Sequence, residues 1–228
     1  MDILLIPGLW LDASSWSEVT PHLEKAGHRV EPLTMPGLGE PGSDVGIADW
    51  VAAVVERIDA RQAPVVLVGH SGGGNVAWGA ADARPDRVAR VVFVDTTPPP
   101  TGFGISEFEV VDGVVPFPGW DSFDEPDVHD LDAETRARTA PLTKSVPARV
   151  PTDAIELSDA RRFSIPVTML MGELDRPALE ERLAEWGPFE AEFRAIDDVE
   201  VVKLGSGHWP QFSMPVRLAE QIRAAVER

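Results

Sequence analysis

The chain has 228 residues, a formal net charge of −18 and no cysteine. This length fits one large α/β domain, and the lack of cysteine excludes disulfides, a thiol nucleophile and thiolate metal ligands. The acidic balance disfavours nucleic acids and anionic membranes as partners, because both would be repelled. No apolar run approaches the roughly 20 residues of a membrane span, and Asp2 stands where a signal peptide carries positive charge. We therefore expect a soluble cytoplasmic protein, a monomer or homodimer, whose partner is a small-molecule substrate.

Apolar runs of β-type residues alternate with longer helical patterns along most of the chain. This alternation is typical of a parallel sheet covered by helices on both faces. Strands are predicted at residues 3–6, 29–33, 65–68, 91–94, 167–171 and 200–204. Helices are predicted at residues 14–25, 47–60, 75–83, 178–193 and 216–226. The expected fold class is α/β, with a mostly parallel central sheet.

Residues 97–160 differ in composition from the rest of the chain. They contain nine of the 21 prolines, thirteen acidic and only four basic residues, and they show no strand pattern. This composition predicts an inserted lid of short helices and loops, carried by a core formed from residues 1–96 and 161–228. If the acidic side chains rim the entrance to a site, they would repel anionic substrates. If they only solvate the outer face of the lid, they have no such effect, and the sequence leaves both interpretations open.

The third predicted strand runs directly into Gly69-His70-Ser71-Gly72-Gly73, and an alanine-rich helical pattern follows. Ser71 therefore lies at the tip of a tight strand-to-helix turn, which is the geometry of a nucleophile elbow. A serine at positive φ brings the residues two before and two after it into contact, so both positions must be glycine. The pattern predicts that Ser71 is a nucleophile.

A serine hydroxyl needs a base to take its proton and a third group to orient that base. Among the five histidines, only His208 lies on a glycine-lined loop between the last strand and the last helix. His22 and His28 flank the first predicted helix, and His129 lies in the acidic lid. His70 precedes the nucleophile, so its side chain should point away from the hydroxyl and pack or hydrogen-bond. The sequence therefore predicts His208 as the general base.

Two aspartates compete for the role of the orienting acid. Asp175 closes a Gly-x-x-Asp turn directly after a strand, at the sheet edge where ligands bind in open parallel sheets. The order Ser71, Asp175, His208 is also the order expected of this type of fold. Asp95 ends the strand that follows the elbow and is the alternative, although it could instead be a turn residue bonded to the backbone near Thr97. We predict Asp175 as the acid.

An acyl-transfer site also needs donors for the developing oxyanion. The backbone N–H of Gly72 lies at the start of the elbow helix, where the helix dipole adds positive potential. The loop after the first strand offers the second donor, and the N–H of Leu9 is the best candidate there.

These motifs resemble those of the α/β-hydrolase superfamily almost from one end of the chain to the other. The resemblance is greatest to small esterases that share a compact form with plant hydroxynitrile lyases. One departure is Pro7, which stands where members of the superfamily usually carry histidine before glycine. The motifs that carry the resemblance are Pro7-Gly8-Leu9-Trp10 with Trp16, Gly69-His70-Ser71-Gly72-Gly73, Gly172-Glu173-Leu174-Asp175 and Gly207-His208-Trp209-Pro210.

The resemblance implies an α/β-hydrolase fold and a serine hydrolase that cleaves a small, neutral carboxylic ester or lactone through an acyl-enzyme. No metal and no cofactor are expected. The same triad on this fold also supports C–C hydrolases and lyases, which are the alternative among enzymes. An alternative of another class is a small-molecule receptor with vestigial hydrolase activity. Substrate-binding residues are expected among the aromatic side chains of the first loop, the lid and the last loop: Trp10, Phe103, Phe108, Phe117, Trp120, Phe123 and Trp209.

Overall fold

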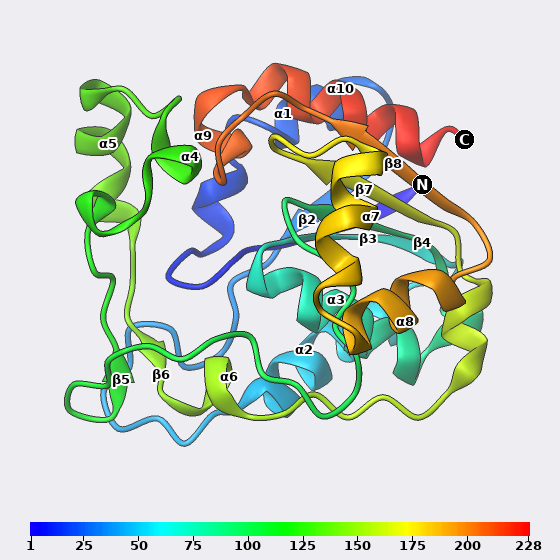
Figure 1. Ribbon diagram of the computed structural model, residues 1–228, viewed down its shortest axis with the longest axis horizontal. Helices are drawn as coiled ribbons and strands as arrows, with labels where there is room; N and C mark the ends of the chain where they lie inside the picture. The colour runs from blue at the N-terminus through cyan, green and yellow to red at the C-terminus, as the bar shows by residue number, and fades with distance from the viewer.

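The computed structural model describes residues 1–228 and is organised around a six-stranded sheet (Figure 1). The strands lie in the order β2-β1-β3-β4-β7-β8, and every pairing between neighbours is parallel. The α/β class and the parallel sheet predicted from the sequence are confirmed. The six strands are β1 (Asp2–Ile6), β2 (Arg29–Pro32), β3 (Val65–His70), β4 (Val88–Val94), β7 (Val167–Met171) and β8 (Val199–Lys203).

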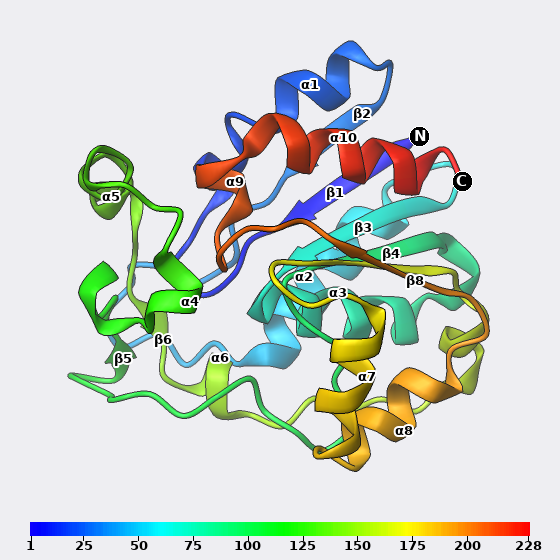
Figure 2. The same cartoon turned by 45° about the horizontal axis from the view of Figure 1, so that its top comes forward.

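Helices cover both faces of this sheet, as Figure 2 shows. On one face, α1 (Thr20–Lys25) and α10 (Pro215–Val226) pack through Leu23 and Ile222 against the sheet. On the other face, α2 (Ile47–Asp59), α3 (Gly72–Ala83), α7 (Arg176–Ala184) and α8 (Pro188–Ala195) enclose the larger part of the core. The central strand β3 is buried along its whole length, which explains why it reads as an unbroken apolar run.

Two of the predicted helices are broken in the structure. The first consists of a 3₁₀ helix at Ala13–Trp16 followed by α1, instead of one helix over residues 14–25. The pattern at residues 178–193 divides into α7 and α8 because Gly187 adopts a φ of +25° and Pro188 begins a new helix. Both residues are signals for a helix break that the apolar periodicity conceals.

Residues 97–160 form short elements, among them α4 (Glu125–Val128), α5 (Ala133–Thr139) and α6 (Arg149–Thr152). The expectation that this segment holds no strand is wrong, since β5 (Val114–Val115) and β6 (Val146–Pro147) form a small antiparallel sheet. The remaining elements are α9 (Pro210–Ser213) and 3₁₀ helices at Pro85–Arg87, Trp120–Ser122, Ala140–Leu142 and Ala160–Ser164. None of the helices combines the length and apolar character that crossing a membrane requires.

Candidate active site

Ser71 lies between the end of β3 and the start of α3 with φ of 51° and ψ of −126°, a conformation that L side chains rarely adopt. The two glycines that flank it are sterically required. A Cβ on Gly69 would lie 2.5 Å from the carbonyl oxygen of Gly73, and a Cβ on Gly73 would lie 2.5 Å from that of Pro7. The elbow thus packs directly against the loop that follows β1, and this close approach raises the Ser71 hydroxyl above the sheet edge.

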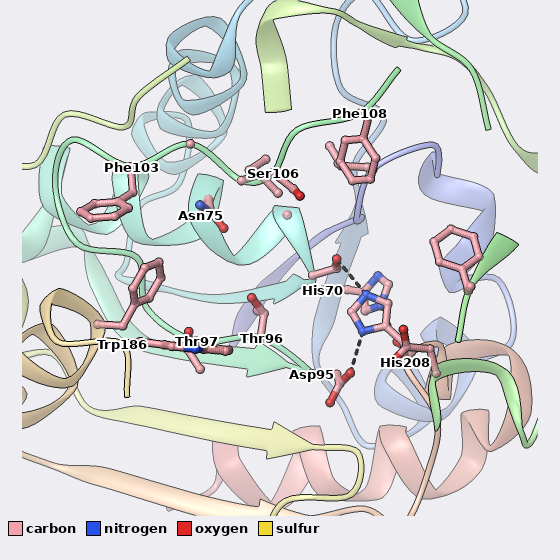
Figure 3. Close-up of a pocket in the computed structure, with 18 of the residues that line it drawn as sticks. His70, Asn75, Asp95, Thr96, Thr97, Phe103, Ser106, Phe108, Trp186 and His208 are labelled. Atoms are coloured by element: carbon pink, nitrogen blue, oxygen red, sulfur yellow. Dashed lines mark hydrogen bonds and ion pairs between the residues drawn. The ribbon is translucent and has the colours of Figure 1, made fainter. Parts of the chain in front are cut away.

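His208 links the Ser71 hydroxyl to a carboxylate. Figure 3 shows the His208 ring beside Asp95. The Nε2 of this ring lies 2.9 Å from Ser71 Oγ, and its Nδ1 lies 2.6 Å from Asp95 Oδ2. Since a carboxylate only accepts, Nδ1 carries the proton and Nε2 presents its lone pair to the serine hydroxyl. This arrangement suits removal of the hydroxyl proton by the imidazole.

Asp95 is held in place on both carboxylate oxygens. Its Oδ1 accepts a hydrogen bond of 2.8 Å from the N–H of Gly172, while Oδ2 faces His208. Its own backbone adopts a φ of +46° directly after β4, which turns the side chain toward the loop that carries His208. Burial alone would raise the pKa of Asp95, but the hydrogen bonds from His208 and Gly172 and the charge of His208 outweigh burial and hold it below its ordinary value. The carboxylate therefore stays ionised at neutral pH.

The structure corrects the sequence-based choice of Asp175 as the orienting acid. Asp175 is the N-cap of α7, where its Oδ1 accepts a 3.1 Å hydrogen bond from the N–H of Ala178, and it is exposed. The turn after β7 directs this side chain into the first turn of a helix instead of toward the imidazole. Asp95, the alternative, occupies the position beside His208.

The two expected oxyanion donors lie on facing loops. A Cβ on Gly72 would come within 3.2 Å of Leu9 Cγ, and both residues line the same cavity as Ser71. The adjoining Trp10 adopts a φ of +64°, which marks a sharp turn in the loop after β1. The start of α3 and this loop therefore approach each other at the nucleophile, as an oxyanion site requires.

The triad opens into a cavity of about 840 Å³. No lysine or arginine side chain lines it, whereas Asp127 and Glu185 do. Asp127 is the only acidic residue of the segment 97–160 that lines the cavity, so the acidic composition of that segment belongs almost entirely to other surfaces. Burial raises the pKa of Asp127, and the neighbouring charge of His208 partly offsets that effect.

Five of the seven aromatic residues expected to bind substrate line this cavity: Trp10, Phe103, Phe108, Phe123 and Trp209. The other two, Phe117 and Trp120, are not among the residues that line it. Phe117 and Trp120 stack on each other with ring centroids 4.9 Å apart, and Trp120 packs against Trp209 at 4.9 Å. They support the aromatic wall from behind instead of forming its surface.

Sequence reasoning missed the opposite end of the cavity. Trp186 and Phe189 lie at the junction of α7 and α8, and Phe189 packs against Phe103 with centroids 5.4 Å apart. Figure 3 shows Phe103 and Trp186 together at one end, with Phe108 and His208 toward the other. The Gly187-Pro188 break is the sequence signal that could have placed Trp186 in a turn after α7 and Phe189 in the first turn of a new helix.

The segment 97–160 also contacts the loop that carries His208. The N–H of His208 donates to the carbonyl of Asp127 over 2.7 Å, and the N–H of Gly207 donates to Asp130 Oδ2 over 2.8 Å. A Cβ on Gly207 would lie 2.3 Å from the Asp127 carbonyl, so only glycine permits this approach. No group of three or more His, Cys, Asp or Glu side chains is arranged to hold a metal ion.

Comparisons with known proteins agree with this architecture. Among curated proteins, the chain is 32% identical over 106 residues to a carbendazim hydrolyzing esterase of Nocardioides, covering 44% of each chain. It is 33% identical over 124 residues to lipase LipV of Mycobacterium tuberculosis, covering 52% of this chain and 45% of the lipase. The alignments thus span under half the length of these two relatives.

Solved structures match over nearly the whole chain. An extracellular alpha/beta-hydrolase from a Paenibacillus species superposes with a TM-score of 0.79 at 20% identity, covering 99% of this chain and 98% of its own. A pyrethroid hydrolase from Sphingobium faniae superposes with a TM-score of 0.71 at 23% identity, covering 100% and 97%. The sequence profile of the alpha/beta hydrolase family matches residues 3–221, and the chain belongs to that family.

Proposed function

We propose that the protein is a serine esterase whose triad is Ser71, His208 and Asp95. The observation that carries this proposal is the continuous hydrogen-bonded chain from Ser71 Oγ through the imidazole to the Asp95 carboxylate, opening into a large cavity. The esterases among the curated relatives support the same class of reaction.

In the proposed reaction, Ser71 Oγ attacks the ester carbonyl carbon while His208 Nε2 takes the hydroxyl proton. The N–H groups of Leu9 and Gly72 stabilise the negative oxygen of the tetrahedral intermediate. His208 then gives its proton to the leaving alcohol, and the acyl group stays on Ser71. A water molecule, deprotonated by the same imidazole, releases the carboxylic acid and restores the serine.

The lining of the cavity indicates the class of ester. An uncharged substrate fits a cavity that no lysine or arginine lines and that three acidic residues line, because an anion would meet no partner there. A volume of about 840 Å³ is in the upper part of the range for drug-sized ligands, roughly 300–1,000 Å³. We therefore propose an uncharged ester with a bulky apolar group, larger than the small ester expected from the sequence. The ester carbonyl would lie at Ser71, and the apolar group would extend toward Trp186 and Phe103.

The decisive experiment compares two aspartate variants on a series of p-nitrophenyl esters. Asp95→Asn should lower kcat by about 10⁴-fold, because an amide no longer holds His208 in the required tautomer. Asp175→Asn is the matched control, since asparagine is also a good N-cap and α7 should remain intact. It should leave kcat nearly unchanged, because Asp175 is exposed and its side chain bonds the N–H of Ala178 instead of the imidazole. The reverse result would return the role of the acid to Asp175.

Ser71→Ala tests the nucleophile itself. It should fold normally and lose activity by on the order of 10⁴-fold or more, since only the oxyanion donors and the binding site remain. A fluorophosphonate probe should add one equivalent of mass at Ser71 of the native protein. Labelling at another serine, such as Ser14 or Ser206, would show that the assignment is wrong. A protein that is stabilised by esters but does not hydrolyse them would instead be a receptor.

A further inference from the structure

His70 lies at the wall of the candidate cavity and contacts three of the segments that form it. Its side chain is buried, with 1% of the residue exposed. Its Nε2 lies 2.7 Å from the backbone carbonyl oxygen of His208. Its Nδ1 faces the side-chain amide of Gln211 at 3.3 Å, and a Cβ on Gly8 would lie 2.7 Å from the same nitrogen. The ring thus connects the elbow, the loop after β1 and the loop that carries the base.

These partners determine the protonation of the ring. The carbonyl of His208 can only accept, so the proton of a neutral His70 must reside on Nε2. Nδ1 is then an acceptor, and it receives the N–H of Gln211. Burial, together with the charge of His208, lowers the pKa of His70 to about 3. The ring therefore stays neutral, and stays in this tautomer, throughout the pH range in which the protein would act.

We propose that His70 is a positioning residue whose Nε2–H ties the main chain of His208 to the nucleophile elbow. His70 directly precedes Ser71 in the chain, so the serine and its base share one rigid anchor at the end of β3. On the opposite side, Asp127 and Asp130 of the segment 97–160 accept hydrogen bonds from the loop that carries His208. This inference rests on the proposed function, because the geometry that His70 fixes is the distance between Ser71 and His208.

Two consequences follow from removing the donor on His70. The carbonyl of His208 would lose a hydrogen bond in a buried position, so the loop would shift to find another partner. A displacement of about 1 Å at a reacting group can cost about 10²-fold in rate. The rate of the chemical step should fall, whereas KM should change little, because His70 lines the cavity with only 1% of the residue exposed there.

The test compares two substitutions of similar length. His70→Gln keeps a side-chain N–H that can reach the His208 carbonyl, whereas His70→Met has no donor. We expect His70→Met to lower kcat by about 10²-fold with KM nearly unchanged, and His70→Gln to recover most of that loss. Both are assayed well below their melting temperatures. His70→Leu replaces the methionine variant if that variant does not fold.

Val68→Ala is the control for a purely structural effect, since Val68 is a buried residue of β3 outside the site. It should lower the melting temperature without changing kcat. The inference is overturned if His70→Met keeps the native kcat, or if the glutamine and methionine variants lose kcat equally. Ser71→Ala measured in parallel separates the two proposals. If it stays active, the proposed function fails, whatever the His70 variants do.

Discussion

Because His70 is buried and neutral, it should make the free energy of unfolding depend on pH. Replacing His70 by a residue that does not titrate should remove this part of the pH dependence. Its pKa is about 3 in the folded protein and 6.5 in an unfolded chain. Between pH 6.5 and pH 3, therefore, the imidazole is protonated in the unfolded chain but neutral in the folded protein. Its stabilising contribution is complete above pH 6.5 and is lost as the pH falls from 6.5 toward 3. The titratable groups that face the ring are His208, whose charge lowers its pKa, and Asp95, whose charge raises it.

The size of the effect follows from these two pKa values. They differ by about 3.5, which corresponds to about 5 kcal/mol of unfolding free energy when the pH lies below both. Over an accessible range the loss is smaller. Linkage between protonation and folding gives a loss of about 2 kcal/mol between pH 7.5 and 5, and about 3 kcal/mol between pH 7.5 and 4.

Urea unfolding of the native protein and of His70→Gln at pH 7.5, 5 and 4 measures this contribution. Glutamine does not titrate, and the carboxylates of the two proteins are the same. The native protein should therefore be the more stable by a margin that shrinks by about 2 kcal/mol at pH 5 and about 3 kcal/mol at pH 4. His22→Gln, on the exposed surface of α1, is the control for exchanging a histidine for glutamine.

A margin that stays constant from pH 7.5 to pH 4 would refute the reasoning. It would mean that His70 takes up a proton as readily in the folded protein as in the unfolded chain. The ring would then not be held neutral between Gln211 and the His208 carbonyl.

Three further predictions concern the elbow, the core and the far end of the cavity. Gly73→Ala should destabilise the protein by about 3 kcal/mol or prevent folding, as urea unfolding would show, because the new Cβ would lie 2.5 Å from a backbone oxygen. Arg162→Met should lower the free energy of unfolding by about 3–5 kcal/mol, because it leaves the buried carboxylates of Asp82 and Glu192 without their cation. An unchanged unfolding midpoint would contradict that. Trp186→Ala should raise KM for esters with long acyl chains and leave that for acetate esters nearly unchanged, since Trp186 lines only the distant part of the site; equal effects on both would place the apolar group elsewhere.

Local sequence patterns determined the fold class and predicted Ser71 and His208, the nucleophile and base of the proposed triad. The elbow could be predicted because its steric requirement is local. A serine at positive φ needs glycine two residues before and two after it, and both glycines are visible in the sequence. His208 could be predicted because a single histidine follows the last strand of a parallel sheet, whose strands all end at one edge.

The choice of Asp95 as the acid of the proposed triad rests on the tertiary structure alone. Asp95 and Asp175 both follow strands, β4 and β7, which are neighbours in the sheet, so the sequence offers each of them the same edge. A left-handed turn at Asp95 and the N–H of Gly172 on the adjacent loop aim one carboxylate at His208. The carboxylate of Asp175 instead caps the N-terminus of α7. An aspartate after a strand can cap the next helix or orient a distant histidine, and capping needs only neighbouring residues. Which of the two contacts an aspartate makes depends on how the loops pack.

The far end of the cavity and the role of His70 depended on the tertiary structure in the same way. Trp186 and Phe103 come from segments far apart in the chain, and nothing in either segment indicates that they meet. The ring of His70 meets the carbonyl of His208, 138 residues later, only because β3 ends beside the loop that follows β8. Sequence patterns report on neighbours within one element, whereas contacts between loops depend on how the strand ends are brought together in the folded sheet.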